Sequence, residues 1–191
     1  NVIPVTLELG GKSPQLVFED ADLDAALPFL VNAGIQNAGQ TCSASSRILV
    51  HKSRYEEVSE HMATRYRALT AKSAEEDGDL GPVISERQKK IVETFLDKGS
   101  DLTLAANGQI ECAAPASGNF VAPHLFTDVP QDHTLAREEI FGPVQVIIPF
   151  GNEQEAVRIA NGTDYGLVAS IWTKDGARQM RLAKKIRSGQ I

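Results

Sequence analysis

The sequence predicts an α/β fold in which three layers, α/β/α, are built around a largely parallel sheet. Segments with strand patterns alternate with amphipathic helical segments along most of the chain, and this alternation is typical of βαβ units. Residues 144–150 are almost all apolar, as expected for a parallel strand that is buried on both faces. Residues 167–172 have the same character and predict a second buried strand.

The first part of the chain is expected to contain three strands and two helices. Residues 2–9 are rich in Val, Ile, Thr and Leu, which favours a strand. Three aspartates between residues 20 and 24 favour a helix start, where the helix dipole is positive, and Pro28 is expected to kink this helix or shift its start. The expected elements are strands over residues 2–9, 15–18 and 47–51, a helix ending near residue 38 and a helix over residues 55–69.

The rest of the chain is punctuated by clear start and turn signals. Ser53 and Ser85 each begin a capping-box pattern, and Asn107-Gly108 is a turn signal. The expected elements are a polar loop over 73–81, a helix ending at 99, strands over 102–106, 144–150 and 167–172, short strands near 119–121 and 124–126, a helical turn within 132–138, and helices over 153–162 and 175–187.

Composition excludes several classes of function. The 191 residues suffice for one domain with a real core, and the net charge of −6 argues against a nucleic-acid partner. Neither a signal-peptide pattern nor a run as long as a membrane span is seen. Two cysteines and four scattered histidines show no metal-ligand spacing, so we predict no metal site. An unpaired working thiol fits a reduced compartment, and we expect a cytoplasmic protein.

Residues 39–44, Gly-Gln-Thr-Cys-Ser-Ala, form a small-residue loop that carries Cys42 between a helix and a strand. Gly39 can end the helix by adopting a positive φ. The small neighbours leave room for a substrate carbonyl, and the N–H of Cys42 can donate to an oxyanion formed there. Because the thiol follows a helix C-terminus, the helix dipole would not ionise it, and activation must come from a base, local amides or a cofactor. By contrast, Cys112 lies outside any motif and is expected to be incidental.

A nucleophilic thiol needs a group that handles protons, and Glu8 is the nearest upstream candidate, 34 residues before Cys42. This spacing is about one strand–helix unit, so the two side chains can meet at one edge of an α/β sheet. A carboxylate in an apolar segment also requires a partner or a function, since burying it unpaired is costly.

Three motifs together resemble the aldehyde dehydrogenase family: Leu-Glu-Leu-Gly-Gly-Lys-Ser-Pro at 7–14, Gly-Gln-Thr-Cys at 39–42 and Glu-Glu-Ile-Phe-Gly-Pro-Val at 138–144. The resemblance implies an NAD(P)+-dependent oxidation of a small-molecule aldehyde. It assigns Cys42 as the nucleophile and Glu8 as the residue that activates water to hydrolyse the thioester. It also implies that Glu139 binds the nicotinamide ribose hydroxyls and that Phe141 packs beside that ribose.

The resemblance also predicts what lies outside these residues. Residues 1–191 match the catalytic, thiol-bearing domain, whereas the family's nucleotide-binding domain and a C-terminal segment are absent. NAD or NADP would then be held mainly by the absent domain, and we expect the 191 residues alone to be inactive as a dehydrogenase. The parent protein is expected to be a homo-oligomer, either a dimer or a tetramer.

Three alternatives remain open from the sequence. Relatives that transfer the acyl group to coenzyme A typically lack the acid at the Glu8 position, so its presence favours an acid product. The same Cys/Glu pair could serve an esterase or thioesterase without a nicotinamide cofactor. The third alternative is a catalytically silent domain.

Overall fold

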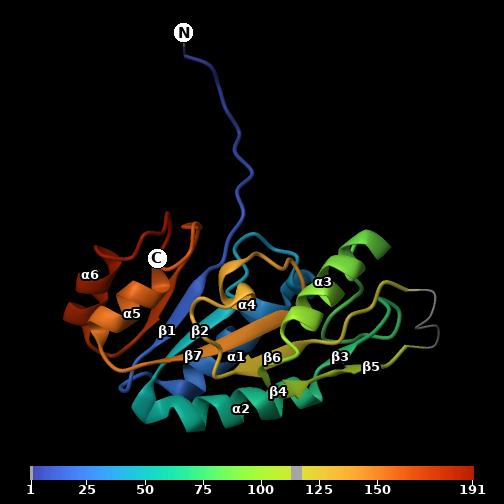
Figure 1. Cartoon of the computed structure of the whole chain (residues 1–191), viewed down its shortest axis with the longest axis horizontal. Coiled ribbons are helices and arrows are strands. Elements are labelled where there is room, and N and C mark those ends of the chain that lie inside the picture. The colour runs from blue at the N-terminus through green and yellow to red at the C-terminus, as the bar shows by residue number, and fades with distance from the viewer. Residues whose placement is uncertain (1, 113–117) are drawn as a thin grey trace.

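The computed structural model describes residues 2–112 and 118–191 (Figure 1). Its elements in chain order are β1 (Pro14–Val17), α1 (Leu23–Ile35), η1 (Gln36–Gly39), β2 (Arg47–His51), η2 (Lys52–Arg54), α2 (Tyr55–Ala68), β3 (Thr70–Ala71), α3 (Glu86–Lys98), β4 (Thr103–Asn107), β5 (Gln109–Ile110), β6 (His124–Thr127), α4 (Thr134–Arg137), β7 (Val144–Phe150), α5 (Glu153–Ala160), β8 (Ser170–Trp172) and α6 (Gly176–Ala183).

The main sheet has the strand order β4-β6-β7-β2-β1-β8, and only the β4–β6 pair is antiparallel among its described strands. Pro14 of β1 is in register with Arg47 of β2, and Arg47 is in register with Val146 of β7. The amino ends of β1, β2 and β7 therefore lie together at one edge of the sheet. A separate pair of short parallel strands, β3 and β5, lies outside this sheet.

The predicted three layers are confirmed. One core cluster joins one face of the sheet to α1 and α2, with Val17, Ile48 and Ile147 contributed by the strands. The other cluster joins the opposite face to α3, α4, α5 and α6, with Leu16, Leu49 and Ile148 contributed by the same strands. Successive strand residues point to opposite faces, so a strand with helices on both sides must be apolar at nearly every position.

Most predicted elements are present, several of them shorter than expected. The strand over 144–150 and the helix that Ser85 caps are confirmed, and the Ser85 side chain accepts a hydrogen bond from the N–H of Gln88. The strand expected over 167–172 is regular only at Ser170–Trp172, and the last helix ends at Ala183. The short strand expected near 119–121 is not formed. Pro28 lies inside α1, which runs without interruption from Leu23 to Ile35.

The strand predicted for residues 2–9 is wrong. These residues have no regular secondary structure and form an extended segment that projects away from the rest of the molecule (Figure 1). Val2, Ile3, Val5, Leu7 and Leu9 are all exposed, at 57 to 102%. A strand needs a neighbouring backbone to pair with, and nothing among the described residues pairs with this segment. We call residues 2–9 the N-terminal arm.

Candidate active site

Three loops meet at the amino ends of β1, β2 and β7. They are residues 10–13 before β1, residues 39–46 before β2 and residues 138–143 before β7. The parallel register of these adjacent strands places the loops side by side. The three motifs found in the sequence thus converge on one edge of the sheet, although more than 90 residues separate the second from the third.

The loop that carries Cys42 begins with a left-handed turn. Asn37, Ala38 and Gly39 have φ values of 52°, 54° and 73°. Gly39 adopts the positive φ that the sequence predicts, but the helix ends earlier, at Ile35. A Cβ on Gly39 would lie 2.1 Å from the carbonyl oxygen of Gly142, so a glycine is needed both for its φ and for this contact. The cysteine loop is therefore fixed directly against the third motif.

Cys42 itself is exposed, while its backbone is tightly packed. A Cβ on Gly11 would lie 2.1 Å from the carbonyl oxygen of Cys42, so the two backbones touch only because residue 11 has no side chain. Further along, the N–H of Ser45 donates to the carbonyl of Ala33 at 3.1 Å. The thiol is accessible to a substrate on a loop whose backbone is held on both sides.

Glu139 contacts the same glycine pair. Its Oε1 accepts a hydrogen bond of 2.9 Å from the N–H of Gly11, and a Cβ on Gly10 would lie 2.5 Å from its Oε2. The carboxylate is half-buried. Thus Gly11 contacts the Cys42 carbonyl and the Glu139 carboxylate at the same time.

Phe141 lies beside this point with an unusual backbone. Its φ is 56°, a region in which a bulky residue is strained, and its side chain is 37% exposed. The side chain of Gln88 in α3 stabilises the turn by donating to the carbonyls of Ile140 and Phe141, at 3.2 and 2.9 Å. Glu139, Phe141, Gly11 and Thr41 line one shallow depression.

The structure does not bring Glu8 into contact with Cys42. Glu8 is exposed on the N-terminal arm, and no hydrogen bond or ion pair joins it to another described residue. The strand that was expected to fix this side chain is not formed. The pairing of Glu8 with Cys42 stays a prediction.

Two cations, Arg47 and Lys12, are buried below the loops. The sequence suggests a local ion pair for Lys12, which no acid among the described residues forms. Arg47 donates to the carbonyls of Lys12, Ile159 and Ala160 at 2.8 to 2.9 Å, and burial lowers its pKa to about 10. Lys12 is fully buried, and its Nζ has no hydrogen-bond partner among the described residues. Burial, and then the charge of Arg47, lower the pKa of Lys12 to about 7, against the opposing effect of Glu139 and Glu138.

The sequence contains a sign that Arg47 is a buried, hydrogen-bonded residue. Arg47 is a charged residue at the start of the apolar strand Arg47–His51, and a cation buried there must find hydrogen-bond acceptors. Gln145 gives the same signal inside β7, where it is fully buried among apolar residues. Both side chains hold backbone segments next to the cysteine loop.

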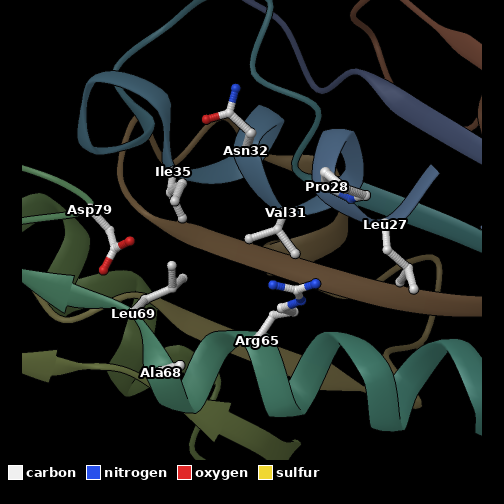
Figure 2. Close-up of a pocket in the computed structure, with 9 residues that line it drawn as sticks. All are labelled: Leu27, Pro28, Val31, Asn32, Ile35, Arg65, Ala68, Leu69 and Asp79. Carbon is white, nitrogen blue, oxygen red and sulfur yellow. The ribbon is translucent and has the colours of Figure 1, made fainter. Parts of the chain in front are cut away.

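An open hollow of about 240 Å³ between α1 and α2 contains none of the candidate residues. Figure 2 shows side chains of α1 facing those of α2 across it, with Asp79 at one end. Its lining residues are Leu27, Pro28, Val31, Asn32, Ile35, Arg65, Ala68, Leu69 and Asp79.

Within residues 2–112 and 118–191, no group of three or more His, Cys, Asp or Glu side chains is placed to hold a metal ion. None of the helices in the described part of the chain has the length and hydropathy needed to cross a bilayer.

Comparison with known proteins gives one consistent result. The model of the aldehyde dehydrogenase family matches residues 1–191. Betaine aldehyde dehydrogenase of Brucella anthropi is 38% identical over 189 residues, which are 97% of this chain and 39% of the relative. Aldehyde dehydrogenase (NAD(P)+) 2 of Saccharomyces cerevisiae is 36% identical over 203 residues, covering 100% of this chain and 39% of the relative.

Solved structures agree with these relatives. A Burkholderia cenocepacia protein that carries the same family name superposes with a TM-score of 0.96 at 55% identity, over 98% of this chain and 40% of that one. The NAD+ complex of aldehyde dehydrogenase from Bacillus cereus superposes with a TM-score of 0.90 at 38% identity, over 98% of this chain and 38% of that one. The chain spans about two fifths of the length of the proteins it matches.

Proposed function

Because the chain belongs to the aldehyde dehydrogenase family, we propose that the full-length protein oxidises an aldehyde to a carboxylic acid with NAD(P)+, using Cys42 as nucleophile. One observation carries this proposal: Gly11 touches both the backbone of Cys42 and the carboxylate of Glu139. A thiol and a ribose-binding acid must be close together if a hydride is to pass from a carbon on the thiol to the cofactor. The relatives named for NAD+ or NAD(P)+ support the same choice of cofactor.

The surroundings of Glu139 fit the ribose of a dinucleotide. One carboxylate oxygen accepts the N–H of Gly11, and the carboxylate as a whole retains lone pairs for two hydroxyl donors. Because Gly10 has no side chain, its backbone can lie close to the other oxygen, which a Cβ there would approach to 2.5 Å. The exposed ring of Phe141 provides an apolar face beside it. When bound, NAD(P)+ supplies the hydride acceptor.

The chain's own residues carry the covalent steps. The thiolate of Cys42 attacks the aldehyde carbon, forming a C–S bond and a thiohemiacetal oxyanion that the N–H of Cys42 can stabilise. Loss of hydride from that carbon leaves a thioester on Cys42. Glu8 then takes a proton from water, the hydroxide adds to the thioester carbon, and the C–S bond breaks to release the acid and the thiolate.

We also propose that the nucleotide-binding part of the enzyme lies outside residues 1–191 and that it covers the N-terminal arm. Five exposed apolar side chains in one extended segment favour contact with another part of a protein. Such contact would fix Glu8, which has no hydrogen bond or ion pair to another described residue. In the full-length protein, we expect the arm to resist proteolysis.

Steady-state kinetics on the full-length protein test the proposal. An aldehyde panel with NAD+ or NADP+ is expected to give NAD(P)H and a carboxylic acid, and Cys42→Ala is expected to abolish both. The matched control is Cys112→Ala, which removes the half-buried cysteine outside the motifs and is expected to leave turnover unchanged.

The products separate the alternatives. Formation of acyl-coenzyme A only when coenzyme A is added would identify an acylating enzyme. Ester hydrolysis without NAD(P)H formation would identify an esterase. Turnover that survives in Cys42→Ala would refute the assignment of the nucleophile.

A further inference from the structure

Gln145 is a polar residue placed in the interior of the sheet. It lies in β7 with 0% of its side chain exposed. A buried amide is tolerated only if its donors and acceptor are paired. Its Nε2 donates to the carbonyls of Leu30 and Ser45, at 2.9 and 2.7 Å, and its Oε1 accepts from the hydroxyl of Tyr66 at 2.5 Å. Both amide hydrogens and the oxygen are therefore in use.

One of these bonds reaches the cysteine loop. Ser45 follows Cys42 by three residues, and its N–H is held by the carbonyl of Ala33 near the end of α1. Its carbonyl is held by Gln145. In the described part of the chain, no other side chain donates to the backbone of residues 41–46. Gln145 is thus the side chain that joins this loop to the core of the sheet, next to a backbone bond of 2.9 Å from the N–H of Val146 to the carbonyl of Ser46.

Two residues next to Gln145, Gly34 and Tyr66, accommodate its side-chain amide. A Cβ on Gly34 would lie 2.1 Å from Cδ of Gln145, so α1 must carry a glycine where the amide crosses it. The carbonyls of Leu30 and Ser45 can only accept, so they hold the NH2 of Gln145 on their side, and its oxygen is left to accept from the hydroxyl of Tyr66. Burial raises the pKa of Tyr66 further above neutral, so this hydroxyl stays a donor.

We propose that Gln145 is a positioning residue for the thiol of Cys42, acting through the carbonyl of Ser45. This proposal rests on the proposed function, in which Cys42 is the nucleophile. Without the bond, Ser45 would be held on one side only, and the thiol would occupy a wider range of positions relative to the aldehyde and the cofactor. Misplacement of a reacting group by about 1 Å can lower a rate by roughly 100-fold.

The chain offers a matched control in Gln15. This glutamine is also buried, lies in the neighbouring strand β1 and donates to the same carbonyl of Leu30, at 3.5 Å. Its oxygen accepts from Ser170 and Trp172, and in the described part of the chain its side chain has no hydrogen bond to the cysteine loop. Gln145→Met and Gln15→Met therefore make the same chemical change in the same layer, and only the first removes the bond to Ser45.

The test compares these two variants in the full-length protein by two measurements. The first is amide hydrogen exchange over residues 41–46, which we expect to be at least tenfold faster in Gln145→Met and unchanged in Gln15→Met. The second is the rate of the first turnover of NAD(P)H formation, which we expect to fall by roughly 10- to 100-fold in Gln145→Met with the KM for NAD(P)+ unchanged.

Unchanged exchange in the loop of Gln145→Met would overturn the proposal, as would faster exchange with an unchanged first turnover. If Gln145→Met does not fold, Gly34→Ala provides a second route, because the three atoms nearest to its Cβ all belong to Gln145, whose amide it would displace. The rate of amide hydrogen exchange reports whether Gln145 holds the loop, and it does not depend on the reaction that Cys42 carries out. Failure of this inference is thereby distinguishable from failure of the proposed function, which Cys42→Ala decides.

Discussion

Glu139 and Cys42 are brought together by a residue with no side chain. Gly11 donates its N–H to the carboxylate and leaves room for the Cys42 carbonyl. Both candidate residues stand out in the sequence because each lies in a motif. The glycine pair at 10–11 also suggests a close backbone approach to Cys42 or to the cofactor. That Gly11 contacts both Cys42 and Glu139 could not be predicted, since this depends on the register of β1, β2 and β7.

The charge of Glu139 is the first residue-scale prediction. Glu139→Gln keeps the shape and weakens hydrogen bonds to two ribose hydroxyls, so the KM for NAD(P)+ is expected to rise about tenfold, equivalent to about 1.4 kcal/mol. The control is Glu138→Gln, which alters the exposed neighbour and is expected to change this KM less than twofold. Equal effects of the two variants on KM would contradict a specific role for Glu139.

For Arg47 and Gln145, burial could be predicted from the sequence, but the hydrogen-bond partners could not. Each interrupts an apolar strand, which is the sign of a buried polar group that must be paired. The partners of Arg47 are backbone carbonyls of residues 12, 159 and 160, and those of Gln145 include backbone carbonyls of residues 30 and 45. Backbone carbonyls carry no sequence signature, so only the folded chain identifies them.

At the scale of the elements, the segments with strong apolar patterns were predicted well and the N-terminal arm was not. The strand at 144–150 and the helix after Ser85 follow from local patterns of hydrophobicity and capping. The arm has strand-forming residues, but strand formation also requires a partner, and the described residues provide none. The end of α1 was also missed, because the positive φ values of Asn37 and Ala38 are set by packing of the loop.

The contact between loops gives an element-scale prediction. Gly11→Ala places a methyl group 2.1 Å from the Cys42 carbonyl, so the cysteine loop must move. We expect the first turnover to fall by roughly 100-fold. Gly176→Ala is the control, since it makes the same change at the first residue of α6, where a Cβ meets nothing within 4 Å, and it is expected to leave the first turnover unchanged. Retention of the wild-type rate in Gly11→Ala would show that this contact does not position the thiol.

At the scale of the whole molecule, the three-layer architecture followed from alternating strands and helices, and it is confirmed. The same pattern does not predict at which end of the strands the candidate site lies. Ligands of open α/β sheets usually bind at the carboxyl ends of the strands, whereas the three motifs here lie at the amino ends of β1, β2 and β7. Glycines at residues 10, 11 and 39 permit this packing of loops.

The buried charge of Lys12 affects the stability of the whole molecule. Its pKa is about 7 when folded and 10.5 when exposed, so between these values the unfolded chain binds more protons and stability rises with pH. The destabilisation is complete below pH 7 and disappears as the pH approaches 10.5. Lys12→Met removes the charge, so its advantage in free energy of unfolding should be largest at pH 7 and below, and should shrink by up to about 1.4 kcal/mol per pH unit as the pH rises.

The measurement is thermal unfolding of both proteins from pH 6.5 to 10. Lys90→Met is the control, because this exposed lysine pairs with Glu86, which raises its pKa. That variant should show no comparable trend in this range. A difference between wild type and Lys12→Met that stays constant with pH would contradict the account of Lys12.

The most direct test of the central claim is to trap the thioester. The full-length Glu8→Gln variant, mixed with an aldehyde and NAD(P)+, is expected to release about one NAD(P)H per active site in a burst, because acylation precedes the step that needs Glu8. After acid quench, mass spectrometry of the peptide containing Cys42 is expected to show the acyl group on that cysteine. A burst of NAD(P)H with Cys42 unmodified would contradict the claim that its thiol is the nucleophile.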